Sequence, residues 1–291
     1  MALTEEWKEQ TSADELIPSL DKSTDEVAWD LYRKAIRFGT WDPAEIDLTQ
    51  DKADFDSLDD DLKGYLIHFC TGFLDAEENV ALKFCPWIML GSSTEQQAFL
   101  STQLLEEFKH TEFFMRYFSE VFGQARIPGV KNIVQQKLDE RIKFMLAALE
   151  LGPEGREEAL VEGLAHYQGI IEGVQAMTGY EVFEAVFRSK GLFPGLAEGF
   201  ARIKEDEGRH VGFGLRMLKL LARNPEHAKR IRRLFDDYLP HILIRYDQPV
   251  MVNGREYPTP PEVRGRERLT KMFERRLKDI FGKANREDFY K

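Results

Sequence analysis

Glu107-Phe108-Lys109-His110 and Glu207-Gly208-Arg209-His210 repeat one pattern, in which a histidine follows a glutamate after three residues. Each stretch lies where apolar residues recur at helical spacing, and this predicts helices over about 95–122 and 197–222. Residues three apart project from the same face of a helix, so the two side chains of each pair can reach one metal ion. A carboxylate combined with an imidazole suits Mn, Fe or Zn. Either pair taken alone can equally consist of a surface acid and a core histidine.

Two further glutamates lie within apolar helical stretches. Glu77 falls in the predicted helix 58–90, and Glu172 falls in Ile170-Ile171-Glu172-Gly173-Val174, within a helix that runs from about Gly155 past Tyr180. A buried carboxylate without a partner is strongly unfavourable, so Glu172 needs a compensating charge. Four helices that bring four glutamates and two histidines inward form the ferritin-like dimetal carboxylate arrangement. The predicted metal ligands are therefore Glu77, Glu107, His110, Glu172, Glu207 and His210, with Glu78 as the rival to Glu77.

Helical periodicity dominates the rest of the chain as well. Additional helices are expected at 25–38, 131–151, 226–244 and up to about 281, and Pro86 is expected to kink or end the helix 58–90. The connections are short and no low-complexity linker divides the chain. The sequence predicts one all-α domain spanning 1–291, with a ferritin-like four-helix bundle core, an N-terminal arm at 1–24 and a short polar tail at 283–291.

Composition excludes several classes of function. The 291 residues carry 40 basic and 51 acidic side chains, and a net charge of −11 argues against a nucleic-acid partner. No apolar run approaches the roughly 18 to 20 residues of a transmembrane segment. The first residues, MALTEEWKEQ, are unlike a signal peptide, and only two cysteines occur, Cys70 and Cys85. These features together predict a cytoplasmic protein.

Two segments resemble the small subunits of ribonucleotide reductase. The stretch Phe38-Gly39-Thr40-Trp41-Asp42-Pro43-Ala44-Glu45-Ile46-Asp47 is similar to a segment near the start of those proteins, and Glu205-Asp206-Glu207-x-x-His210 resembles their Asp-Glu-x-x-His motif. Two positions depart from the reductases. The first-helix ligand there is usually Asp, whereas here it is Glu77, and Phe114 occupies the position of the radical-storing tyrosine.

The sequence more closely resembles the ribonucleotide reductase small-subunit-like ligand-binding oxidases. Glu77-Glu78-Asn79-Val80, Tyr167-Gln168-Gly169-Ile170-Ile171-Glu172-Gly173-Val174 and Thr178-Gly179-Tyr180 match motifs of that group. The resemblance implies a mixed Mn/Fe cofactor, with Mn in the N-terminal site, and a long-chain fatty acid whose carboxylate binds the metals. It also implies an ether cross-link between Val80 and Tyr167.

The spacing of Tyr167 and Glu172 conflicts with a regular α-helix. Residues five apart point about 140° away from each other in an α-helix. Both side chains can face the metals only if the helix contains a π-bulge or a kink, and Gly169 and Gly173 make such a feature plausible.

The function predicted from these residues is an O₂-activating dinuclear oxidase that performs two-electron oxidation. Asp206 is a candidate to orient a ligand histidine or Trp41, although Asp206 can also be a solvated acid and Trp41 a packing aromatic residue. The alternatives are a radical-generating reductase small subunit without the tyrosine, and a metal-storage or structural helical protein. Two Fe ions are the alternative cofactor, because Mn and Fe both accept Glu and His. A homodimer is expected because most soluble oligomers are homodimers.

Overall fold

The computed structural model describes residues 23–124 and 133–282, and nearly all of them lie in helices. The predicted all-α class is confirmed. The N-terminal arm and the polar tail fall almost entirely outside the described residues. The long elements are α1 (Thr24–Phe38), α2 (Thr49–Ser57), α3 (Asp60–Ala81), α4 (Cys85–Leu90), α5 (Thr94–Glu120), α6 (Ile133–Ala148), α7 (Pro153–Leu164), the π-helix η3 (Ala165–Ala176), α8 (Met177–Val186), α9 (Pro194–Leu221), α10 (Pro225–Leu243) and α11 (Gly265–Phe281).

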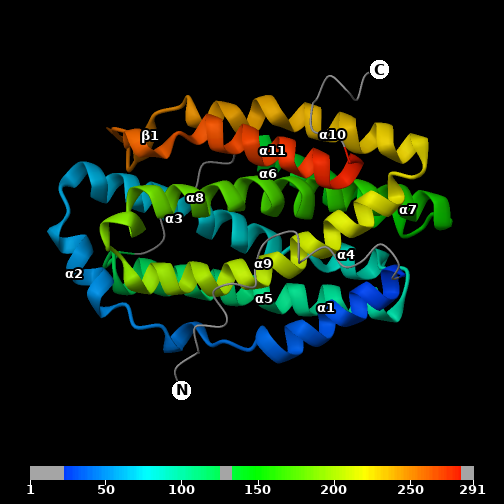
Figure 1. Cartoon of the computed structure of the whole chain (residues 1–291), viewed down its shortest axis with the longest axis horizontal. Helices are drawn as coiled ribbons and strands as arrows, with labels where there is room; N and C mark the ends of the chain where they lie inside the picture. The colour runs from blue at the N-terminus through cyan, green and yellow to red at the C-terminus, as the bar shows by residue number, and fades with distance from the viewer. Residues whose placement is uncertain (1–22, 125–132, 283–291) are drawn as a thin grey trace.

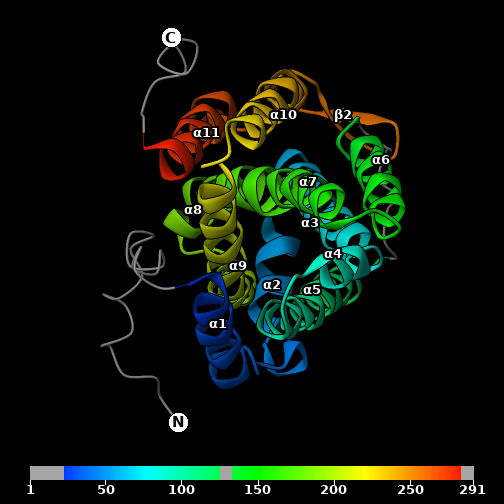
Figure 2. The same cartoon turned by 90° about the vertical axis from the view of Figure 1, so that its right-hand side faces the viewer.

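Four helical columns form the centre of the molecule (Figure 1). They are α3, α5, α9 and the continuous column made by α7, η3 and α8. Seen end on, these columns surround a common core, while α1 packs against α5 and α9 on one side and α10 and α11 cover η3 on the other (Figure 2). This is the predicted four-helix core with additional helices, and its four columns are those that carry the predicted ligands.

Local sequence signals begin the core helices. Ser93 caps α5, where its Oγ accepts a hydrogen bond from the Gln96 backbone N–H at 3.2 Å. Pro153, Pro194 and Pro225 each occupy a first-turn position, where proline's fixed φ suits a helix and its missing N–H leaves no bond unmade. Because each helix begins at a defined residue, the number of residues between its first turn and the glutamate farther along it is fixed.

A cluster of aromatic side chains packs beside the centre of the bundle. The ring centroids of Phe73 and Phe114 lie 5.4 Å apart, and Tyr180 lies 5.6 Å from Phe73 and 5.2 Å from Phe200. Contacts at these separations contribute beyond the burial of apolar area alone. They hold α3, α5, α8 and α9 together close to the predicted ligands.

Three expectations about the elements were wrong. The stretch 58–90 is two helices, because the chain breaks at residues 82–84 and Pro86 lies in the first turn of α4. The predicted all-α domain included no strand, whereas the structure has a hairpin of β1 (Val250–Val252) and β2 (Arg255–Tyr257). Its Asn253-Gly254 turn has positive φ at both residues, as a tight hairpin turn requires. The helix α2 was not anticipated either.

The two cysteines are unpaired in the structure. Cys70 is buried within α3, whereas Cys85 is exposed at the start of α4. Among the described helices, none combines the length and the apolar character that a membrane crossing needs.

Candidate metal centre

The six predicted ligands lie together in the middle of the bundle. One group consists of Glu77, Glu107, His110 and Glu207, and a second consists of Glu107, Glu172, Glu207 and His210. Within each group the ligand atoms all lie within 4.8 Å of one another. All six side chains are buried. Because Glu107 and Glu207 belong to both groups, they lie between two adjoining sites.

Each helical column contributes residues according to its periodicity. The column α3 supplies Glu77, and η3 supplies Glu172 from the opposite side. In α5 and in α9, the Glu-x-x-His spacing places one glutamate and one histidine on the same inward face. The two histidine rings face each other across the centre with their centroids 6.2 Å apart. The two halves of the centre therefore supply nearly the same set of donor groups, and an approximate two-fold axis relates them.

The π-helix resolves the spacing of Tyr167 and Glu172. Backbone hydrogen bonds in a π-helix join residues five apart, so side chains at that spacing lie on nearly the same face. Both residues are in η3 and both are buried. Burial and the negative charges of Glu107 and Glu172 raise the pKa of the Tyr167 phenol well above its usual value. The phenol therefore lies beside the carboxylates and keeps its proton.

Outer carboxylates orient both histidines. His110 Nε2 lies 3.2 Å from Asp206 Oδ2, and His210 Nε2 lies 2.8 Å from Glu106 Oε2. Each histidine thereby directs Nδ1 toward the centre, where His110 Nδ1 is 3.4 Å from Glu77 Oε2. Arg209 donates to Glu106 and to Asp206, and so it links the two outer acids. This is the partner arrangement that fixes the ring orientation of metal-binding histidines.

Asp206 also connects the centre to Trp41. Trp41 Nε1 donates a hydrogen bond to Asp206 Oδ2 at 2.8 Å, and Lys109 Nζ lies 3.2 Å from the same oxygen. Lys109 Nζ is 4.7 Å from the centroid of the Trp41 ring, within cation–π range. Burial acts to raise the pKa of Asp206, but His110, Arg209 and Lys109 outweigh it and hold that pKa well below its usual range. Asp206 is therefore a charged acceptor.

As anions, the four inner carboxylates would carry more negative charge than the positive charge of the described side chains around them can balance. Burial raises the pKa of Glu77 to about 8, and it raises the pKa values of Glu172 and Glu207 as well. Burial acts in the same direction on Glu107, but the adjacent His110 and the charge of His210 lower that pKa to about 2. Carboxylates that resist ionisation in this way are stabilised as anions by bound cations.

Five buried ligand atoms at the centre have no hydrogen-bond partner among the described residues. They are Nδ1 of His110 and of His210, and Oε2 of Glu107, Glu172 and Glu207. Unpartnered polar atoms in a protein interior are rare and costly, and here they converge on two adjoining points. The oxygen and nitrogen donors fit Mn or Fe. The residues present therefore fit a pair of metal ions.

Two residues of the centre were not predicted. Glu106 orients His210 in the way that Asp206 orients His110. The sequence signal for both residues is an acid directly before the glutamate of each Glu-x-x-His motif. Gln103 donates to Glu172 Oε1 at 2.7 Å and lies one helical turn before Glu107. A buried glutamine in an amphipathic helix carries no comparable signal in the sequence.

Other candidate residues lie apart from the centre. Glu78, the rival to Glu77, is half-buried and belongs to neither ligand group. Glu162 pairs with Arg141 and Arg230, while His166 Nδ1 contacts the hydroxyl of Tyr238.

The fold and the centre define a class, the ferritin-like dimetal carboxylate proteins. The chain belongs to the family of the ribonucleotide reductase small chain, whose profile matches residues 19–241. It is similar to solved structures of an R2-like ligand-binding oxidase. One is a variant with an anaerobically reconstituted Mn/Fe cofactor, with 29% identity over 87% of this chain and 93% of that chain and a TM-score of 0.74. Another variant, with an aerobically reconstituted Mn/Fe cofactor, has 27% identity over 87% of this chain and 93% of that chain, with a TM-score of 0.72. The protein is thus an oxidoreductase of the dinuclear metal type.

Replacing Glu106 tests the outer shell of the centre. The Glu106→Gln variant leaves His210 Nε2 without its charged partner, so we expect metal affinity at that site to fall by about 10–100-fold. Competition with a chelator, followed by measurement of bound metal per chain, checks this. Glu205→Gln is the matched control, because Glu205 lies on the same bundle, is exposed and belongs to neither ligand group. Equal affinities in the two variants would contradict the role of Glu106.

Proposed function

We propose that this protein is an O₂-activating oxidase with one Mn and one Fe ion at the dinuclear centre. The observation that carries the proposal is the set of five unpartnered ligand atoms shared between two adjoining sites. Glu77 and His110 would complete the first site, Glu172 and His210 the second, and Glu107 and Glu207 would bridge them. A reduced metal pair supplies electrons to O₂ and stabilises the charge that develops on it. The Mn/Fe composition is supported by the cofactor in the similar oxidase structures.

The protein's own residues prepare the centre for that chemistry. Asp206 and Glu106 hold the histidines in the tautomer that leaves Nδ1 free for a metal. Gln103 donates to Glu172 and so fixes the direction of that carboxylate. The aromatic cluster that includes Phe114 and Phe73 packs beside the ligands and surrounds them with apolar side chains on that side. Phe114 cannot store a radical as a tyrosine does, which supports an oxidase rather than a reductase subunit.

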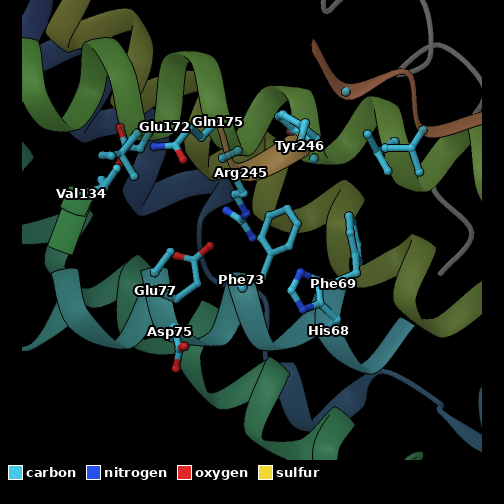
Figure 3. A pocket seen from close by; sticks show the side chains of 18 of the residues that line it. His68, Phe69, Phe73, Asp75, Glu77, Val134, Glu172, Gln175, Arg245 and Tyr246 are labelled. Atoms are coloured by element: carbon cyan, nitrogen blue, oxygen red, sulfur yellow. The ribbon is translucent and has the colours of Figure 1, made fainter. Parts of the chain in front are cut away.

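A cavity of about 550 Å³ adjoins the centre and supports ligand binding. Glu77 and Glu172 line one part of it, and apolar residues of α3 and η3, among them Phe73 and Ile171, line the walls (Figure 3). A pocket with apolar walls and a few polar groups is typical of a binding site for a small molecule. We propose that a long-chain fatty acid binds here with its carboxylate at the metals.

Val80 and Tyr167 line the same cavity next to Glu77 and Glu172. We propose that they form an ether cross-link between Val80 Cβ and the phenol oxygen of Tyr167. Forming this C–O bond removes one hydrogen from Val80 Cβ and one from the phenol, which amounts to two protons and two electrons, and O₂ at the centre accepts the electrons. The location of Val80 one helical turn beyond Glu77 supports this assignment.

We further propose that the protein forms a homodimer and acts in the cytoplasm. Leu105, Phe108 and Met115 are exposed on α5, and their spacing places them on one face of that helix. Large apolar side chains gathered on a surface are typical of an interaction site. The unpaired cysteines suit a reducing compartment.

Metal content is the direct test of the proposed function. After loading with Mn and Fe together in air, we expect about one Mn and one Fe per chain by elemental mass spectrometry. The Glu172→Ala variant should lose metal from one site only. Two Fe per chain in the wild type would replace the mixed cofactor by a di-iron one, and the absence of stoichiometric metal would overturn the proposal.

Peptide mapping tests the cross-link. After aerobic metal loading, we expect the peptides that contain Val80 and Tyr167 to be joined, with a mass two hydrogens below the sum of the separate peptides. Tyr167→Phe removes the phenol oxygen and should give separate peptides while metal content is unchanged. Separate peptides from the loaded wild type would contradict the cross-link and leave the metal centre unaffected.

The oligomeric state tests the exposed face of α5. We expect light scattering to give a mass near 68 kDa, twice the 33.8 kDa of the chain. Phe108→Glu places a charge in the apolar face and should produce a monomer with unchanged helix content. Glu112→Gln is the control on the same helix, since it adds no charge. A wild-type monomer would contradict the homodimer.

A further inference from the structure

Arg245 lies at the mouth of the cavity that leads to the metal centre. The residue belongs to the short helix η5 (Ile244–Tyr246) that follows α10, and it is exposed as a whole. Its guanidinium nevertheless lines the cavity, where it points inward beside Phe73 and His68 (Figure 3). A Cβ on Gly72 would collide with Nη2 of Arg245. The absence of a side chain at Gly72 therefore makes the space that the guanidinium occupies.

Arg245 has no carboxylate partner in the described part of the chain. The neighbouring acids are paired with other cations: Asp247 pairs with Arg266, and Glu267 pairs with Arg264 and Lys271. His68 adds no second positive charge, because burial and the charge of Arg245 lower its pKa and keep the ring neutral. The mouth of the cavity therefore holds a positive charge that no described acid neutralises, facing a space that a ligand can enter.

The separation between Arg245 and the centre limits the ligand that can satisfy both. Gly72, which the guanidinium contacts, precedes Glu77 by five residues on the regular helix α3. Five residues correspond to about 7.5 Å along an α-helix. Since carbon–carbon bonds of about 1.5 Å advance an extended chain by roughly 1.3 Å each, about six bonds span that rise. The walls over this interval include Phe73, Ala76 and Gly179, which offer no charge, while the carboxylate of Asp75 points away from Phe73 and Arg245 (Figure 3).

We infer that the cavity selects an acid with two polar ends, in which one carboxylate binds at the metal centre and a second anionic group, some six to eight carbons farther along, binds Arg245. This inference rests on the proposed function, in which a carboxylate binds at the metals. It specifies the other end of the ligand, so that the preferred acids are α,ω-dicarboxylates and similar two-ended acids rather than simple fatty acids. The alkyl chain of a simple fatty acid would have to pass the guanidinium and would offer it no hydrogen-bond acceptor. A second carboxylate supplies charge-assisted hydrogen bonds that no described acid gives Arg245.

Binding of matched one-ended and two-ended acids to the Mn/Fe-loaded protein tests the inference. We expect octanedioate to bind at least tenfold more tightly than octanoate by calorimetry, and both to change the visible absorption of the metal centre. In Arg245→Gln the ratio of the two affinities should fall to about one, because octanedioate should bind more weakly while the affinity for octanoate stays the same. Arg266→Gln is the matched control, since Arg266 also lines the cavity and loses the same charge but already pairs with Asp247.

Three results would overturn the inference. Equal affinities for octanedioate and octanoate in the wild type would show that Arg245 does not select between them. So would a preference for octanedioate that persists in Arg245→Gln. Equal weakening of both acids in Arg245→Gln would show that Arg245 holds the only carboxylate, with the alkyl end at the metals. Dodecanoate distinguishes failure of the inference from failure of the proposed function. If dodecanoate binds and changes the spectrum but octanedioate gains nothing, the inference alone fails, whereas if no acid binds the loaded protein, the proposed carboxylate ligand fails too.

Discussion

The concentration of buried negative charge at the centre of the bundle is the constraint on which the rest of the structure depends. Four glutamates face one another in an interior where ionised carboxylates are strongly disfavoured without compensation. Two histidines and a pair of metal ions satisfy that requirement, and the outer residues follow from it. Asp206 and Glu106 hold the histidines, and Arg209 joins those two acids, so the charges alternate outward from the centre.

The π-helix η3 is the second consequence of the same requirement. A regular α-helix would present either Tyr167 or Glu172 to the centre, but not both. Widening the helix over Ala165–Ala176 brings both to one face and places the phenol beside the cavity. A π-helix is less favourable than an α-helix and occurs frequently at functional sites. Its location here, opposite α3, brings both Tyr167 and Glu172 to the lining of the cavity.

The cavity has different chemistry at its two ends. Carboxylate and imidazole donors lie at the inner end, and the guanidinium of Arg245, which pairs with no acid among the described residues, lies at the mouth. The residues at the inner end sit on long core helices, which hold them in fixed positions. Arg245 sits on a short segment after α10, where the backbone can vary among relatives without disturbing the bundle. Ligand selectivity can thus change at the mouth while the metal chemistry is kept.

The sequence by itself determined the all-α fold and brought the six ligand candidates together, because helical periodicity is local and fixes which side chains share a face. It also revealed that Tyr167 and Glu172 required an irregular helix. Only the tertiary structure decided that Glu106 orients His210, since these residues lie 104 positions apart and on different helices. The same holds for Arg245, whose guanidinium meets Gly72 of α3 although the two residues are far apart in the sequence. Contacts between distant segments depend on how the helices pack, and no local pattern encodes them.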